Sequence, residues 1–448
     1  MIGSSPRFAV VSLVCAASIG GLIALASADD GGAPPALPPA ARTQQAAVAA
    51  SAHATPLRAT AAVSVDGRKA LASARREADR LVADDELGRR IELSVAPALQ
   101  DRVQKLLAEY RVPYAALVAI EPSTGRILAY VSHSSANPAA PDLAADPTPP
   151  TASVFKLVTS AALIDSGVMA DTRVCYGGGA SRLEPIDLLD DRRHDGSCAS
   201  LADGLGGSIN VVFAKLADRH LDAATLRRYA GLFGFGQKLP CGIDVAPSPV
   251  DIPSERMEFA RTAAGFWHVH MSPLHAALIA ATFANDGLMP SATLVDRVIA
   301  SDGRVLPVAR PPSPRTVLSS ASARTVAQMM LRTVQSGTSR SAFLDPRGRS
   351  LLPGIAVAAK TGSLSASDPY RAYSWWVGFA PADKPTIALA ALIVNTPDWR
   401  IKSSFLAREA LREYLLSKPV AAVAAARVKV FARCGAAESC ERGPVRTP

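Results

Sequence analysis

The stretch TASVFKLVTS, residues 151–160, places a serine and a lysine one helical turn apart in an otherwise apolar segment. Ser153 and Lys156 would project from the same side of a helix, because residues three apart are neighbours on its surface. Lysine is scarce in this chain, which has ten lysines and 38 arginines, and only Lys156 has a serine three residues before it. A desolvated lysine can lose its proton whereas an arginine cannot, so the pair fits a serine nucleophile with a lysine base.

Taken alone, Ser-x-x-Lys also fits a solvated lysine in the first turns of an ordinary helix, because this spacing recurs by chance. A position at the positive end of a helix would disfavour the ammonium form of the lysine and favour a serine alkoxide. The apolar side chains of the segment are expected to anchor the helix in the core under either interpretation. These side chains are Val154, Phe155, Leu157 and Val158.

A second motif, GGSINVVFAKLA at residues 206–217, contains Ser208 and Asn210. A Ser-x-Asn turn at the start of a helix is often a cap and nothing more. Its chemical interpretation is a second hydroxyl that passes protons to a leaving group, beside an amide that binds the substrate backbone or Lys156.

A third motif, AAKTGS at residues 358–363, follows an apolar run with the character of a strand. Lys360 and Thr361 would supply a cation and a hydroxyl to a substrate carboxylate, and Gly362 would let another chain approach closely. An ordinary exit from a strand into a loop would give the same local pattern.

In this order the three motifs resemble those of the penicillin-binding transpeptidase family, which is related to the class A β-lactamases. The resemblance extends over roughly residues 91–418 and includes VAIEPSTGRILAYVS at 118–132 and WWVGFAP at 375–381. The separation of 152 positions from Ser208 to Lys360 is more similar to the spacing of transpeptidases than to that of compact β-lactamases. No Glu-x-x-x-Asn that would suggest a deacylating base lies between those two residues, which argues against a β-lactamase.

The resemblance implies a cleft in which all three motifs act together. The first serine would be the acylated nucleophile and its lysine the base, with the second serine and the asparagine as proton relay and substrate clamp. The last lysine and the threonine would bind the substrate carboxylate, and backbone N–H groups of the first and last serines would form an oxyanion hole. The implied catalytic residues are Ser153, Lys156, Ser208, Asn210 and Lys360, and the implied substrate-binding residues are Thr361, Gly362 and Ser363.

The activity implied by the resemblance is that of a peptidoglycan D,D-transpeptidase that acts on D-Ala-D-Ala stem peptides and is inhibited covalently by penicillin. A D,D-carboxypeptidase would use the same residues with water as acceptor. A serine β-lactamase and a non-catalytic penicillin-binding sensor or scaffold are two further candidates. The implied partners are stem peptides and β-lactam antibiotics, and no metal or other cofactor is expected.

The pattern of elements predicts an α+β fold, with an antiparallel five-stranded sheet flanked by helices and an all-helical lobe. Residues 114–133 form two β-rich runs around a Pro-Ser-Thr-Gly turn, which indicates a hairpin. Three further strands are predicted within 354–363, 373–381 and 386–395. Before them, residues 91–110 have the apolar periodicity of an amphipathic helix, carried by Leu99, Val103, Leu106 and Leu107.

The N-terminal region predicts export. Residues 8–28 carry no charge and have about the length of a membrane helix, so 1–28 is expected to be a signal-anchor or a cleaved signal peptide. Residues 29–90 are expected to be an Ala/Pro-rich linker that ends in a polar helix over 68–90. We expect a single-pass protein of the bacterial cytoplasmic membrane with a periplasmic catalytic domain at 91–418, secreted if 1–28 is removed.

Export permits disulfides, and we predict the pairs Cys175–Cys198 and Cys434–Cys440, the second in a basic tail at 419–448. This leaves Cys241 unpaired. The net charge of +9 comes from dispersed arginines without interleaved aromatic residues, so no nucleic acid is expected as a partner.

His268 and His270 could be metal ligands on one strand face, but a packing or hydrogen-bonding role is the favoured interpretation.

Overall fold

The computed structural model of the protein describes residues 62–179, 182–191, 193–309 and 311–417. These residues belong to one compact unit. The predicted membrane segment at 1–28 and the predicted pair Cys434–Cys440 lie outside them. None of the helices in the described ranges combines the length and the apolar character needed to cross a bilayer.

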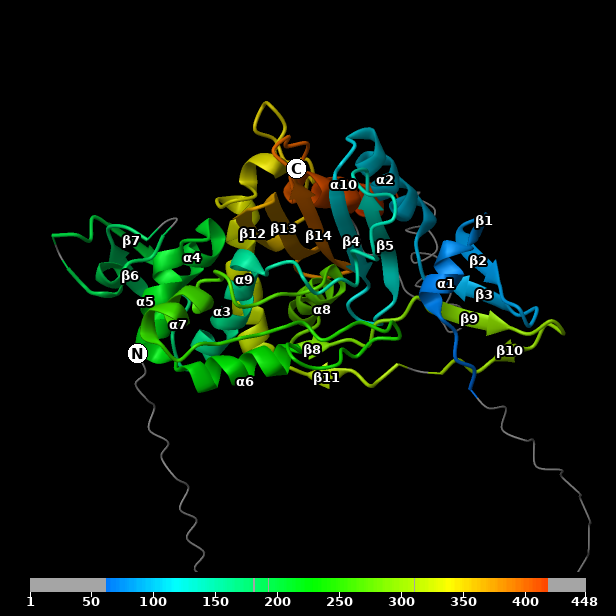
Figure 1. The fold of residues 1–448 in the computed structure, drawn as a ribbon, viewed down its shortest axis with the longest axis horizontal. Coiled ribbons are helices and arrows are strands. Elements are labelled where there is room, and N and C mark those ends of the chain that lie inside the picture. Colours follow the sequence, from blue (N-terminus) through cyan, green and yellow to red (C-terminus); the bar gives the residue numbers. More distant parts are fainter. Residues whose placement is uncertain (1–61, 180–181, 192, 310, 418–448) are drawn as a thin grey trace, which may run out of the picture. The chain divides into compact units, whose positions relative to one another are not determined.

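A five-stranded antiparallel sheet forms the centre of the fold (Figure 1). Its strands are β4 (Tyr114–Ile120), β5 (Ile127–Ser134), β12 (Ala358–Ser367), β13 (Tyr370–Ala380) and β14 (Ile387–Asn395). They follow the order β12-β13-β14-β4-β5, so β14 pairs with β4 and the two ends of the domain share one sheet. The predicted hairpin, the predicted C-terminal strands and the α+β class are confirmed, and β12 lies at the edge of the sheet.

Each face of this sheet has its own layer of helices (Figure 1). On one face lie α2 (Pro97–Glu109) and α10 (Ser403–Leu416), and on the other lies α8 (Pro273–Ala284). Neighbouring residues of a strand point to opposite faces. Trp376 therefore packs in the cluster of α2 and α10, whereas Trp375 packs in the cluster of α8, and both are fully buried. The amphipathic helix predicted within 91–110 is confirmed, because its four apolar residues are buried in α2.

A mainly helical lobe packs against the α8 side and the β12 edge (Figure 1). Its helices are η1 (Ala152–Phe155), α3 (Lys156–Asp165), η2 (Pro185–Leu188), α4 (Leu201–Gly207), α5 (Asn210–His220), α6 (Ala223–Phe233), α7 (Arg256–Ala263) and α9 (Ser320–Gln335). The short helix η3 (Arg340–Phe343) lies instead beside α10, on the other face of the sheet. The prediction of an all-helical lobe was wrong in one part. The strands β6 (Arg173–Tyr176) and β7 (Ser197–Ser200) form an antiparallel hairpin there. Cys175 and Cys198 lie directly opposite each other on the two strands, and their disulfide holds the strands together.

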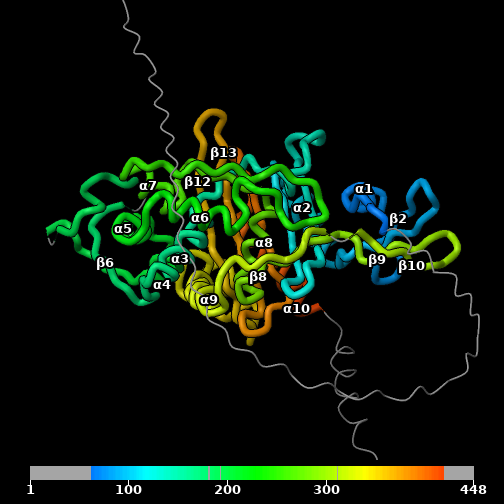
Figure 2. The backbone as a smooth tube through the Cα atoms, turned by 90° about the horizontal axis from the view of Figure 1, so that it is seen from below, coloured from blue at the N-terminus to red at the C-terminus, as the bar shows by residue number. Residues whose placement is uncertain are grey.

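A second sheet replaces the polar helix predicted over residues 68–90. The helix α1 covers only Gly67–Ala72, and strands β1 (Arg75–Glu77), β2 (Arg80–Asp84) and β3 (Arg90–Leu93) follow it. Two later strands, β9 (Val295–Ile299) and β10 (Val305–Leu306), complete this sheet in the order β1-β2-β3-β9-β10 (Figure 1). Figure 2 shows α1, β2, β9 and β10 lying together. The prediction failed because Ile91 and Leu93 of β3 are buried against Val298 of β9, a partner about two hundred residues away. Regular structure is therefore present within residues 62–90, before the predicted start of the domain at residue 91.

A short two-stranded sheet, β8 (Leu288–Met289) with β11 (Arg315–Thr316), completes the described elements. The cysteine prediction is confirmed for Cys175, Cys198 and Cys241, which the structure describes. Cys175 and Cys198 form a disulfide, and Cys241 is a buried free thiol that donates to the carbonyl oxygen of Ile243 at 3.1 Å.

Candidate active site

The turn that carries Ser153 is held from both sides. Ser153 lies in η1, just before α3, and the sheet fixes the approach to it because Trp375 Nε1 donates to the carbonyl oxygen of Pro150 at 2.8 Å. Ala152 has a positive φ of 48°. Gly265, with φ +81°, lies so close that a Cβ there would be 2.4 Å from the carbonyl oxygen of Ala152. The four apolar residues predicted to anchor this segment are all buried.

Lys156 opens α3 and is fully buried. Its Nζ lies 2.8 Å from Ser153 Oγ and 2.7 Å from Asn210 Oδ1, and it also donates to the carbonyl oxygen of Ala264. Burial, with a smaller contribution from the positive charge of Lys360, holds the pKa of Lys156 well below its usual range. A neutral amine has two N–H groups and one lone pair. In that form the two carbonyl oxygens would take the N–H groups, and the lone pair would be left for the hydroxyl proton of Ser153.

The Ser-x-Asn motif joins two helices. Ser208 ends α4 in the left-handed conformation with φ 57°, and Asn210 is the first residue of α5. The preceding turn is tied to the region that leads to the sheet. Thr338 N donates to the carbonyl oxygen of Gly206 at 3.1 Å, and Arg332 pairs with Asp203 of α4.

Lys360 reaches the same site from the edge strand β12. It is fully buried, and its Nζ lies 2.8 Å from Ser208 Oγ and 2.6 Å from the carbonyl oxygen of Thr361. Burial lowers the pKa of Lys360 to about 7. The hydroxyl of Thr361 lies 2.5 Å from that of Thr338.

Gly362 explains how β12 and the nucleophile turn come together. A Cβ at this position would lie 3.1 Å from Val154 Cγ2 and 3.2 Å from the carbonyl oxygen of Thr151. Glycine therefore lets the strand lie directly against η1. Ser363 follows on β12 and is exposed.

The structure brings the three motifs together, because Lys156 links Ser153 to Asn210, and Lys360 links β12 to Ser208, two residues before Asn210. The catalytic and binding roles assigned to these residues stay predictions. Sequence reasoning missed the carbonyl oxygen of Ala264, whose position depends only on the backbone. It also missed Gly265 and Thr338, for which the only local signal was a glycine after two alanines and a Gly-Thr turn.

The two histidines of GFWHVHMSP have hydrogen-bonding roles. Nε2 of His268 lies 3.1 Å from Glu258 Oε2, and Nδ1 of His270 donates to the carbonyl oxygen of Thr148 at 2.7 Å. Within the described part of the chain, no three His, Cys, Asp or Glu side chains form a group that could hold a metal ion.

Known proteins resemble this chain in sequence and in fold. The family described as penicillin binding protein transpeptidase domain matches residues 115–415, more than half of the 448-residue chain. Peptidoglycan D,D-transpeptidase PbpA of Mycobacterium tuberculosis is 28% identical over 360 residues, which cover 72% of this chain and 71% of that protein. PbpA of Mycolicibacterium smegmatis is 27% identical over 360 residues, with the same shares covered.

Among solved structures, the ceftriaxone acyl-enzyme complex of penicillin-binding protein A from M. tuberculosis matches with a TM-score of 0.61 at 25% identity. The match covers 73% of this chain and 80% of that one. The resemblance inferred from the three motifs is thereby confirmed: this chain belongs to the penicillin-binding protein transpeptidase family.

Proposed function

We propose that the protein is a peptidoglycan D,D-transpeptidase that works through an acyl-enzyme on Ser153 and is acylated by penicillin. The observation that carries the proposal is the fully buried Lys156 Nζ, which lies 2.8 Å from Ser153 Oγ and whose acceptors among the described residues are uncharged oxygen atoms. The names of the PbpA relatives and the acyl-enzyme complexes of a related protein support it.

In the first half-reaction, the neutral amine of Lys156 takes the hydroxyl proton of Ser153 while Oγ attacks the penultimate carbonyl of the D-Ala-D-Ala end. The peptide bond to the last residue breaks, and Ser208, hydrogen-bonded to Lys360, delivers a proton to the departing amine. The proton that Lys156 took from Ser153 then replaces the one that Ser208 gave up. Lys360 and Thr361 bind the terminal carboxylate. The backbone N–H groups of Ser153 and of Ser363, on the edge strand, stabilise the oxyanion.

In the second half-reaction, the amine of a neighbouring stem attacks the ester carbonyl. The bond to Ser153 Oγ breaks, the acceptor nitrogen gives a proton to Ser208, and a proton passes from Ser208 through Lys156 to Oγ, which leaves Lys156 as the free amine. The product is a crosslink and the catalyst is unchanged. Water in place of the amine would give a trimmed stem instead.

Labelling with fluorescent penicillin tests the nucleophile. We expect a stable covalent band with the full chain and none with Ser153→Ala. Ser166→Ala, at an exposed serine just after α3, is the matched control and should label like the unaltered protein. A band that persists in Ser153→Ala would overturn the proposal, and rapid loss of the label would indicate a β-lactamase.

A stem pentapeptide, incubated with and without an amine acceptor, tests the acceptor. We expect released D-alanine to be accompanied by crosslinked product when the amine is present. Trimmed tetrapeptide as the sole product under saturating amine would identify a D,D-carboxypeptidase.

We also infer that the catalytic domain acts outside the cytoplasm, tethered by residues 1–28 or secreted. The solvent-accessible disulfide Cys175–Cys198 supports this location, because such bonds persist in oxidising compartments. Protease added to spheroplasts should digest the domain. Protection from the protease in intact spheroplasts would contradict the inference.

A further inference from the structure

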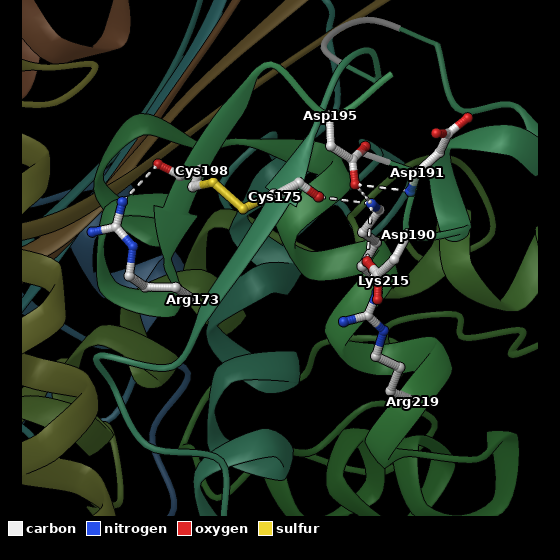
Figure 3. Close-up of a disulfide and its surroundings, with 8 residues drawn as sticks. All are labelled: Arg173, Cys175, Asp190, Asp191, Asp195, Cys198, Lys215 and Arg219. Atoms are coloured by element: carbon white, nitrogen blue, oxygen red, sulfur yellow. Dashed lines mark hydrogen bonds and ion pairs between the residues drawn. A yellow bond between two sulfur atoms is a disulfide. The ribbon is translucent and has the colours of Figure 1, made fainter. Parts of the chain in front are cut away.

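Lys215 is a fully buried lysine that the proposed reaction does not use. It lies on α5, five residues after Asn210, and its acceptors come from the region of the disulfide hairpin (Figure 3). Its Nζ donates to the carbonyl oxygen of Cys175 at 2.7 Å and to Asp195 Oδ2 at 3.0 Å, and lies 3.5 Å from Asp190 Oδ1. A cation so deeply buried is stable only with such partners.

Two carboxylates lie within ion-pair distance of this lysine. The side chain of Asp195 is only 6% exposed, and its Oδ2 also accepts from the backbone N–H of Asp191 at 3.3 Å. Asp190 is exposed and is shared with Arg219, one turn further along α5, at 2.5 Å. Two cations of one helix face are thus held by the segment that β6 and β7 enclose (Figure 3).

The same segment reaches the catalytic end of α5. A Cβ at Gly179 would lie 2.6 Å from Cβ of Val211, so the backbone there packs directly against the residue that follows Asn210. The disulfide Cys175–Cys198 joins the two strands at the position where Cys175 accepts from Lys215. Any rotation or shift of α5 would have to break these contacts.

Asn210 in turn sets the environment of the base. Its Oδ1 is 2.7 Å from Lys156 Nζ, and Ser208, two residues before it, is 2.8 Å from Lys360 Nζ. A displacement of about 1 Å in such a site can cost roughly a hundredfold in rate. The rate of acylation therefore depends on the position of α5, although Lys215 itself touches no reacting atom.

We propose that Lys215, clamped by Asp195 and the disulfide hairpin, is a positioning residue that sets Asn210 and Ser208 against the two catalytic lysines. The inference rests on the proposed acyl-transfer function and deepens it. It assigns a role in the reaction to the disulfide hairpin. Sequence reasoning had treated this hairpin only as a pair of cysteines.

The test measures the second-order rate of acylation by fluorescent penicillin across pH in the full chain, in Lys215→Met and in Asp195→Asn. We expect the rate to fall at least about tenfold in Lys215→Met. Looser packing admits water to Lys156 and raises its pKa, so the acid limb of the profile should move to higher pH. Lys238→Met is the matched control, because Lys238 is an exposed lysine with an aspartate partner, and it should leave both readouts unchanged.

A lower melting temperature with an unshifted acid limb and a rate near that of the unaltered chain would mean that Lys215 has a structural role only, and would overturn the inference. If Lys215→Met does not fold, Asp195→Asn decides on the same two readouts, because Lys215 keeps its acceptor at Cys175. Absence of labelling in the unaltered chain would overturn both the proposed function and the positioning role that rests on it. Normal labelling there together with normal variants would overturn the positioning role alone.

Discussion

Lys156 and Lys215 are both buried completely, yet their surroundings differ in kind. Within the described part of the chain, Lys156 contacts neutral oxygen atoms, from Ser153, Asn210 and Ala264, whereas Lys215 contacts two carboxylates. Burial without a counter-charge favours the free amine, and burial with one favours an ion pair. The comparison shows that the partners of a buried lysine, and not its depth, decide whether it can act as a base.

Exchanging each lysine for arginine should give the largest difference in acylation rate between the two positions. Arginine keeps the charge but cannot release a proton. Lys156→Arg should therefore lose about 10²- to 10⁴-fold in the rate of acylation by penicillin, the usual contribution of a general base. Lys215→Arg keeps a cation between two aspartates and should lose less than about tenfold, with a lower melting temperature from its larger volume. Equal losses at the two positions would show that the distinction is wrong.

His275 tests whether a shifted pKa by itself marks a catalytic group. It is fully buried on α8 and lies 2.7 Å from Ser248 Oγ and 2.9 Å from the carbonyl oxygen of Phe233, and burial lowers its pKa to about 4. The folded state keeps this ring neutral, whereas the unfolded chain takes up a proton below about pH 6.5. The stabilisation is complete above about pH 6.5 and is lost as pH falls towards 4, by roughly 3 kcal/mol.

His275→Gln should therefore flatten the fall in unfolding free energy between about pH 6.5 and pH 4, while acylation at neutral pH changes little. Urea unfolding at several pH values measures the slope. The exposed His220, changed to glutamine, serves as control. An unaltered slope in His275→Gln would contradict the assignment.

The pH profile of acylation should separate the protonation of Lys156 from that of Lys360. Lys156 must be neutral, so the rate should rise with pH as Lys156 loses its proton, at a pH well below that of an ordinary lysine. Lys360 must be charged to bind a carboxylate, and its pKa of about 7 predicts a fall in rate above about pH 7 in the free enzyme. A bound carboxylate should move that alkaline limb upwards. A rate that keeps rising through about pH 9 is incompatible with this assignment.

Thr338 should give the smallest effect. Thr338→Val removes the hydroxyl next to that of Thr361, and the loss of one such hydrogen bond costs about 1 kcal/mol, or roughly a fivefold drop in acylation rate. Thr338→Ser keeps the hydroxyl and should restore most of the rate. Failure of Thr338→Ser to do so would assign the effect to packing of the methyl group.

Local patterns predicted the central sheet well, since β4, β5, β12, β13 and β14 are apolar runs separated by turn residues. They failed after α1, where charged residues at helical spacing within 75–90 belong to strands. Those strands are stabilised by Val298 and its neighbours on β9, a partner that no local window contains.

The candidate site divides in a similar way. Ser153 and Lys156 were found because their spacing and the scarcity of lysine are visible in the chain. The acceptor at Ala264 and the role inferred for Lys215 were not, because both depend on which backbone or side-chain oxygen atoms the fold brings to a buried amine.

By itself, the sequence determined the residue types and their order: a serine before a lysine, a serine before an asparagine, and Lys-Thr-Gly on a strand. Only the tertiary structure decided that Lys156 faces neutral oxygen atoms whereas Lys215 is paired with carboxylates. The reason is physical. A side chain's chemistry is local, but its protonation depends on the dielectric and the charges around it, and segments far apart in the chain supply these.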